Sequence, residues 1–195
     1  MLWRGVSTAD IRQPPDRVPL DRDAIVEAAI DLLDAEGLDQ LSTRKLAARL
    51  GVKGPSLYWH VKNMAELHTL IADRLLSDAL PPPDAPGDWK AWMADGARAY
   101  RRAALSHRDG ARLLASARPT PERRAQRFTA NIARLQREGF SHHDARACFM
   151  VLSRFAMGWA LGEQGGPGPT EASQADFEFG LAAMLDGLEA RRGAA

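Results

Sequence analysis

The stretch STRKLAARLGVKGPSLYWHVKN, residues 42–63, decides the fold of this 195-residue chain. Its first half places three apolar residues on one face of a short helix, at Leu46, Ala47 and Leu50. Ser42 or Thr43 can cap the start of this helix, because each hydroxyl can accept a hydrogen bond from a backbone N–H of the first turn. Gly51 can adopt the left-handed conformation that ends it. These signals predict a helix of about two turns followed by a tight turn.

The second half of the stretch predicts another short helix, which begins near Pro55. Proline suits the first turn of a helix, where its missing N–H has no partner to lose. Leu57 and Val61 are four residues apart and supply the buried face of this helix. Two short helices joined by a glycine turn form the helix-turn-helix arrangement, whose second helix enters the major groove of DNA.

Basic residues gather on this stretch, although the whole chain has a formal net charge of only +1. The stretch contains no acidic residue and carries Arg44, Lys45, Arg49, Lys53 and Lys62. The segment before it, residues 21–39, is acidic. A local positive face on a nearly neutral protein indicates a polyanionic partner. We expect this partner to be double-stranded DNA, with the acidic segment turned away from it.

Outward-facing side chains on the second helix fit the same partner. Because Leu57 and Val61 face inward, the residues that face solvent are Ser56, Tyr58, Trp59 and His60. Exposed aromatic and hydroxyl groups between lysines suit contacts with phosphates, thymine methyl groups and base edges. A solvated structural turn is the alternative interpretation, since a single tyrosine or tryptophan more often belongs to a core.

The domain organisation follows from the segments around this module. Residues 1–19 are interpreted as a flexible N-terminal arm, whose arginines either contact DNA or have no role. Residues 20–66 form the predicted helix-turn-helix domain, opened by an amphipathic helix that Gly37 ends. Residues 67–195 form the predicted helical effector-binding and dimerisation domain. The boundary falls inside a long amphipathic helix that runs to about Ala79.

The rest of the chain predicts helices only, because it lacks the alternation typical of strands. The expected ranges are 88–105, 111–116, 121–138, 142–163 and 172–192. The last two ranges are apolar on nearly all sides, and a small helical domain buries such helices most simply against a second copy. We therefore expect an all-α homodimer with a four-helix interface and two recognition helices about 34–36 Å apart.

No residue pattern predicts catalysis. The run His107-Arg108-Asp109 is like the start of a kinase catalytic loop, but Leu114 stands where that loop requires an asparagine. His142 and His143 are adjacent, so they point in different directions on a helix and have no evident third metal ligand. We expect no enzyme activity, no cofactor and no metal site.

The remaining composition indicates a cytoplasmic protein without a membrane partner. No apolar run reaches the length of a membrane span, and the first residues lack a secretory segment. Cys148 is the single cysteine, which fits a reducing compartment. It lies in an apolar stretch and is interpreted as a small hydrophobic residue, with a redox sensor as the alternative.

The stretch at residues 41–63 resembles the DNA-binding signature of the TetR family of bacterial repressors. SHRDGARLL (106–114), ARPT (117–120) and EGFS (138–141) extend the likeness, chiefly to the tetracycline-repressor branch. The resemblance implies a repressor that leaves a palindromic operator when a small-molecule effector binds its helical body. The implied DNA contacts are Ser42, Thr43, Arg44, Pro55, Ser56, Tyr58, Trp59, His60 and Lys62.

The resemblance also implies an effector site at Leu80, Tyr100, Leu114, Ala117, Arg118 and Pro119. The branch binds magnesium-tetracycline through two histidines and a glutamate, whose positions fall here on Leu80, Leu114 and Gly162. These residues cannot replace the water ligands of a hard cation, and the neighbouring Glu163 is only a weak substitute. We therefore expect a more apolar effector, with Tyr100 and Arg118 as polar contacts.

Two departures in the DNA-binding segment predict a different operator. Gly54 stands where the branch has a base-reading glutamine, and Met64 stands where it has a phosphate-binding lysine. Other functions stay open at this point. The chain could be an activator or an effector-independent regulator with the same DNA-binding module, or a helical protein that sequesters a ligand.

Overall fold

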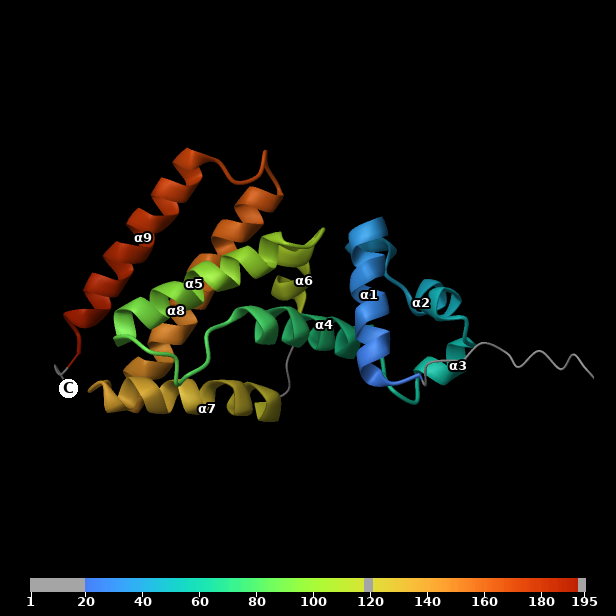
Figure 1. Cartoon of the computed structure of the whole chain (residues 1–195), viewed down its shortest axis with the longest axis horizontal. Coiled ribbons are helices and arrows are strands. Elements are labelled where there is room, and N and C mark those ends of the chain that lie inside the picture. The colour runs from blue at the N-terminus through green and yellow to red at the C-terminus, as the bar shows by residue number, and fades with distance from the viewer. Residues whose placement is uncertain (1–19, 118–120, 193–195) are drawn as a thin grey trace, which may run out of the picture.

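The computed structural model describes residues 20–117 and 121–192, and these contain helices and no strand. The helices α1 to α3 form a head at one end, and α5 to α9 form a larger body at the other (Figure 1). The elements of the head and the connecting helix are α1 (Arg22–Glu36), η1 (Leu38–Gln40), α2 (Thr43–Leu50), α3 (Gly54–Leu57) and α4 (Met64–Ala79). Those of the body are α5 (Trp89–Leu105), α6 (Gly110–Ser116), α7 (Pro121–Arg137), α8 (His142–Gln164) and α9 (Glu171–Glu189). The predicted all-α class is confirmed, while the predicted N-terminal arm lies outside the described residues.

The helix boundaries of the head follow from its capping residues. Ser42 is the N-cap of α2, and its hydroxyl accepts a hydrogen bond from the backbone N–H of Lys45. Gly51 ends α2 in the left-handed conformation, with φ 65° and ψ 28°. Asn63 caps α4, its side chain accepting from the N–H of Glu66 at 2.8 Å. These caps restrict α3 to the short interval between two fixed helices.

The second helix of the predicted helix-turn-helix is shorter than predicted. The four-residue α3 ends at Leu57, and residues 58–60 form a turn in which the His60 and Val61 N–H groups both donate to the Leu57 carbonyl. Asn63 needs an extended backbone, φ −164°, to cap α4, so the helix cannot continue to it. Leu57 and Val61 are nevertheless buried, as the sequence predicted.

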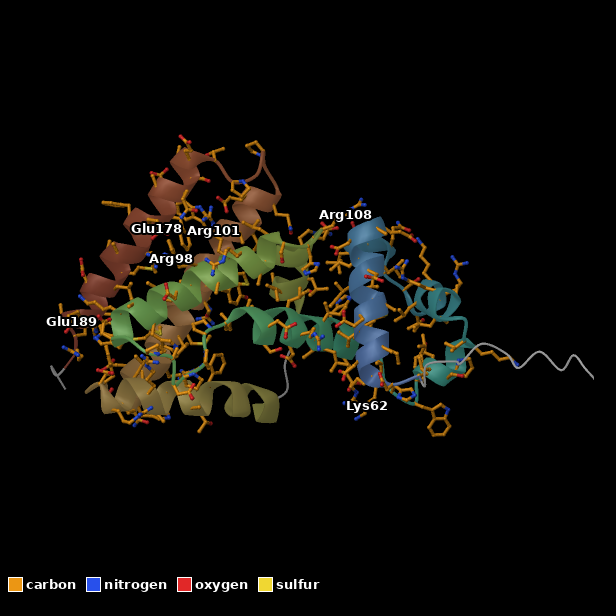
Figure 2. The ribbon with its side chains drawn as sticks, viewed as in Figure 1. Lys62, Arg98, Arg101, Arg108, Glu178 and Glu189 are labelled. Atoms are coloured by element: carbon orange, nitrogen blue, oxygen red, sulfur yellow. The ribbon has the colours of Figure 1, made fainter. Side chains whose placement is uncertain are left out.

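The head is attached to the body by a cluster of hydrogen bonds, here called the clasp, which joins Asp34, Leu38 and Asp39 to residues 107–112. The Asp34 carboxylate lies 2.9 Å from His107 Nδ1 and accepts from the Arg108 N–H at 3.0 Å. Figure 2 shows Arg108 where the body meets α1. Arg112 Nη2 donates to Asp39 Oδ1 at 2.8 Å.

Asp109 lies at the centre of the clasp in a left-handed conformation, with φ 56°. Its carboxylate accepts from the Leu38 N–H at 2.9 Å, and this bond is the main reason why the Asp109 pKa lies below its usual value. Gly37 leaves room for this contact, because a Cβ there would stand 2.9 Å from Asp109 Oδ2. The head therefore has one closely fitted orientation on the body.

A buried ion pair connects three helices of the body. Arg101 on α5 donates to Glu163 on α8 at 2.8 Å and 2.5 Å, and both side chains are less than a tenth exposed. The Ser173 hydroxyl on α9 donates to the same carboxylate at 2.7 Å, and the Arg101 guanidinium lies 4.7 Å from the Phe177 ring centre. The bonds from Arg101 hold the pKa of Glu163 below its usual value. Figure 2 shows Arg101 between α5 and α9, near the half-buried pair Arg98–Glu178.

We predict that Glu163→Leu lowers the free energy of unfolding by about 3–5 kcal/mol, because Arg101 would stay buried without a counter-charge. Urea unfolding at one fixed protein concentration measures the loss. The double variant Arg101→Met, Glu163→Leu removes both charges and should recover most of it. The loss should shrink as the pH falls below the ordinary glutamate pKa of about 4.3, because the stability from a depressed carboxylate pKa disappears on protonation. Equal destabilisation by the single and double variants would contradict this account.

Candidate DNA interface and ligand cavity

The turn after α3 presents large side chains to solvent. Trp59 is 89% exposed and Tyr58 is 54% exposed, which is unusual for aromatic residues in a folded head. Arg22 on α1 fixes this turn, because its Nε and Nη2 atoms donate to the His60 carbonyl at 3.2 Å and 3.1 Å. The sequence patterns did not identify Arg22 as part of this region, since its only signal is a charge at the start of α1.

The predicted DNA contacts lie on adjoining parts of the head. Ser42 and Thr43 are at the N-terminus of α2, where free backbone N–H groups favour an anion such as phosphate. Pro55 and Ser56 are in the first turn of α3. The remaining residues of the set follow on the turn or stand exposed beside it: Arg44, Tyr58, Trp59, His60 and Lys62. Lys62 lies at the edge of the head (Figure 2).

The positive charge of the head is smaller than the sequence indicated. Lys45 lies 2.5 Å from the Glu36 carboxylate, and Arg49 lies 2.8 Å from that of Asp31. The acidic residues of α1 therefore neutralise two of the five basic residues and do not only face away from DNA. The basic residues that form no ion pair with the described part of the chain are Arg44, Lys53 and Lys62.

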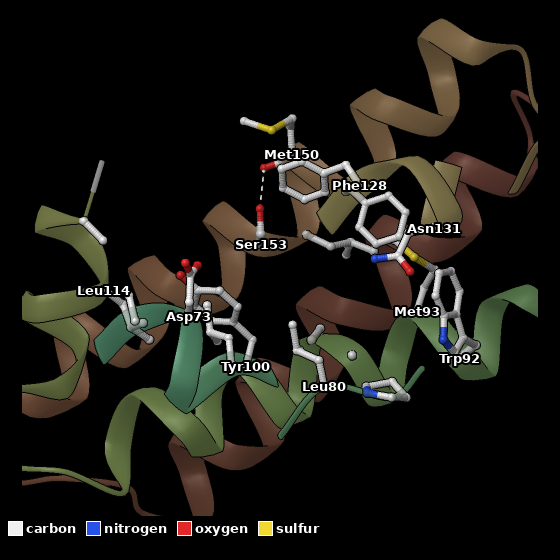
Figure 3. Close-up of a pocket in the computed structure, with 18 of the residues that line it drawn as sticks. Asp73, Leu80, Trp92, Met93, Tyr100, Leu114, Phe128, Asn131, Met150 and Ser153 are labelled. Atoms are coloured by element: carbon white, nitrogen blue, oxygen red, sulfur yellow. Dashed lines mark hydrogen bonds between the residues drawn. The ribbon is translucent and has the colours of Figure 1, made fainter. Parts of the chain in front are cut away.

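The body and α4 together form a half-open cavity of about 370 Å³, bounded by α4, α5, α6, α7 and α8. Leu80, Tyr100, Leu114 and Ala117 line it, so four of the six predicted effector residues come together at one place (Figure 3). The other two, Arg118 and Pro119, lie outside the described residues. A concave, mostly apolar cavity of this size is typical of a small-molecule site.

Aromatic and polar residues that the sequence did not single out complete the cavity. Trp92, Phe128 and Phe149 form a chain of ring contacts, with centroids 5.6 Å and 6.1 Å apart. Asp73, Asn131 and Ser153 add polar groups, as Figure 3 shows. Their helical spacing looks like ordinary core or surface spacing, and only the fold reveals that α4, α7 and α8 converge here.

The cavity does not fit the metal that the resemblance suggests. Leu80 and Leu114 offer no ligand atoms, and Gly162 has no side chain. Glu163 already accepts hydrogen bonds from Arg101 and Ser173, and it does not line the cavity. Within the described residues, no group of three or more His, Cys, Asp or Glu side chains could hold a metal ion.

Cys148 is fully buried, and burial raises the pKa of its thiol to about 11. The thiol is therefore protonated at neutral pH, which disfavours a redox role because the thiolate is the reactive form. In the part of the chain that the structure describes, no helix is long and apolar enough to cross a membrane.

Together the fold and the site define a helix-turn-helix regulator, with a DNA-reading head and a helical body that holds a ligand cavity. Residues 25–69 match the protein family described as "Bacterial regulatory proteins, tetR family", and residues 81–173 match the family described as "Tetracyclin repressor-like, C-terminal domain". The chain belongs to the TetR family of DNA-binding transcriptional regulators. The resemblance inferred from the sequence is thus confirmed. Regulators of this family are generally not enzymes.

Several relatives cover nearly the whole chain. The class A tetracycline repressor protein from transposon 1721 of Escherichia coli is 36% identical over 200 residues, which is 89% of this chain and 92% of that protein. A solved variant of TetR from Acinetobacter baumannii AYE, in complex with minocycline, is 35% identical with a TM-score of 0.81 and covers 89% of this chain and 98% of that one. The Streptomyces coelicolor protein ActR in complex with actinorhodin is 31% identical with a TM-score of 0.79, covering 91% and 100%.

We predict that Arg44→Ala weakens operator binding by about 1–3 kcal/mol and lowers the salt slope by about one. Arg44 is exposed and forms no ion pair with the described residues, so its guanidinium is available to DNA. Fluorescence anisotropy with a labelled operator duplex, between about 50 and 200 mM salt, measures both quantities. Lys45→Ala on the same helix is the matched control and should change the slope less, because Glu36 already neutralises Lys45. An equal change in slope for both variants would show that these ion pairs break on DNA.

Proposed function

We propose that this protein is a homodimeric repressor that binds a palindromic operator and leaves it when an apolar, aromatic small molecule fills the cavity. The position of α4, between the cavity and the head, supports this proposal most directly. Five cavity residues belong to α4 or its C-cap, at Thr69, Ala72, Asp73, Leu76 and Leu80. The same helix packs against α1 of the head, where Arg74 lies 2.8 Å from Glu27. A molecule in the cavity therefore touches the helix that sets the position of the head.

The chemistry of the cavity supports an apolar ring system as the effector. Its walls include Trp92, Tyr100, Phe128 and Phe149, together with two methionines and several aliphatic residues. Aromatic walls favour flat ligands through stacked and edge contacts. The polar groups at Asp73, Asn131 and Ser153 can fix the orientation of a ligand that carries a few hydrogen-bonding atoms.

Exposed apolar residues on α8 and α9 support the dimer. Phe179 is 79% exposed and Val151 is 43% exposed, so both would be costly to leave in water. Gly158 and Gly162 on α8 and Ala182 and Ala183 on α9 are also exposed, and such small residues let helix backbones approach closely. Pairing of these faces around a two-fold axis would give a four-helix interface and two heads. We place the protein in the cytoplasm, where such a dimer meets DNA.

The proposed residues divide between the two units. The head, residues 20–66, would contact DNA through the set from Ser42 to Lys62. The body, residues 67–195, would bind the effector and the second copy. If the coupling is of ordinary size, the effector weakens operator binding by about 1–3 kcal/mol, and the operator weakens effector binding equally.

The first test is selection of bound sequences from random duplex DNA by the purified protein. We expect enrichment of a palindrome whose half-sites lie about one helical turn apart, because a two-fold dimer presents two heads to one face of DNA. The variant Arg44→Ala is the control and should not enrich the same sequence. If the protein instead binds all duplexes equally and only at low salt, specific repression is excluded.

We further predict that magnesium-tetracycline does not bind in the micromolar range, because the cavity offers leucine side chains in place of metal ligands. Isothermal titration with tetracycline, in the presence and absence of magnesium, measures this directly. The double variant Leu80→His, Leu114→His is the informative comparison, since it restores two imidazoles to the cavity wall. Magnesium-dependent binding by the unchanged protein would contradict the prediction.

A further inference from the structure

Arg134 on α7 is a buried arginine whose partners are carbonyl groups. It is 6% exposed and forms no ion pair with any residue that the structure describes. Its Nη1 atom donates to the carbonyls of Pro83 and Ala85 at 3.0 Å and 2.7 Å, and its Nη2 atom donates to that of Gly87 at 2.9 Å. Burial of an arginine without a carboxylate partner is costly unless its donors are satisfied by hydrogen bonds. Because three carbonyls of one loop supply those bonds, we infer that Arg134 holds that loop in place.

The loop held by Arg134, residues 81–87, joins the C-terminus of α4 to α5. Trp92 also holds it, because the indole Nε1 donates to the Pro82 carbonyl at 3.0 Å. The guanidinium of Arg134 lies 4.5 Å from the centre of the Trp92 ring, a cation–π contact that fixes the ring as well. Within the loop, the Ala85 N–H donates to the Pro82 carbonyl, and Ala85 packs against the apolar core of the body. Among the described residues, Arg134 and Trp92 supply the side-chain hydrogen bonds to the loop carbonyls.

The loop and the Trp92 ring, which Arg134 holds in place, both contribute to the cavity wall. Trp92, Leu80 and Pro81 line the cavity, and so do Phe128 and Asn131 on α7 itself (Figure 3). Trp92 also contacts Phe149 on the opposite side through an edge-on ring pair at 5.6 Å. Arg134 thus stands behind the wall where α4 ends, and it does not line the cavity.

We propose that Arg134 is the positioning residue that makes the cavity end of α4 a fixed point, so that a bound molecule displaces the head and not the loop. This inference rests on the proposed function, in which an occupant of the cavity lowers operator affinity. Without the anchor, the loop and the Trp92 ring would yield to the occupant. Binding would then no longer be transmitted along α4.

Hydrogen–deuterium exchange of the free protein tests the anchor without any ligand. Arg134→Met should speed exchange of the amides in residues 80–90 by about tenfold or more, while the peptides of α2 and α8 keep their rates. Arg134→Lys keeps the charge but not the fork of donors, and it should give an intermediate rate. Arg137→Met is the matched control on the same helix, because Arg137 is exposed and has no partner in the described part of the chain. Unchanged loop rates in Arg134→Met, or equal acceleration throughout the body, would overturn the proposal.

A second measurement tests transmission, with the dye 8-anilinonaphthalene-1-sulfonate as the cavity probe and the selected operator duplex as the DNA. Gly96→Phe tests whether the dye binds in the cavity, because Gly96 lines the cavity with open space at its Cβ position. A phenylalanine ring there would occupy that space, so this variant should lose dye binding. We expect the dye to weaken operator binding of the wild type by about fivefold or more. Arg134→Met should bind the dye with an affinity within about threefold of wild type. Its operator affinity should nevertheless stay the same when the dye is bound. Full transmission in Arg134→Met would overturn the proposal. A wild type that binds no dye, or binds it without effect on the operator, would count against the effector role of the cavity, while the exchange rates would still decide whether Arg134 is an anchor.

Discussion

The continuity of α4 is the constraint on which the other features depend. Its first turn is capped by Asn63, which follows the exposed turn after α3, and its C-cap, Leu80, lies in the cavity wall. A helix with unbroken backbone hydrogen bonds is stiff over this length, so its two ends cannot move independently. The clasp adds a second connection between head and body, from Asp34 to His107 and from Asp39 to Arg112. The orientation of the head is therefore set at two places, one of which is next to the cavity.

The buried charged residues of the body have structural partners and do not line the cavity. Glu163 is occupied by Arg101 and Ser173, and Arg134 is occupied by loop carbonyls. The described walls of the cavity are dominated by rings and aliphatic groups. The rigidity of the surrounding helices matters for signal transmission as much as the lining residues do. Flexible walls would rearrange around a bound ligand without moving α4.

Much of the fold was predictable because its signals are local. Ser42, Gly51 and Asn63 each mark a helix end through their own side chain or backbone preference, and the structure places caps at all three. The predicted length of α3 was wrong, because the length of this helix depends on competition between neighbouring caps. The cavity was predictable only in part: Leu80, Tyr100, Leu114 and Ala117 followed from the resemblance, while Asp73 and Asn131 in its wall and Arg134 behind the wall have no local signal. Their roles arise where distant helices meet, and spacing along one helix does not contain that information.

The ion pairs between α1 and α2 bear on how the protein searches DNA. Because Lys45 and Arg49 are paired with acidic residues, the described part of the head has fewer cations left to displace the counterions that surround any duplex. We therefore expect a low affinity for arbitrary sequence as long as these pairs persist on DNA, with most of the binding energy at the correct site coming from base edges and groove shape. A regulator of this kind would spend little time on the excess of unrelated DNA in a cell, so a small number of molecules would be enough to occupy the target.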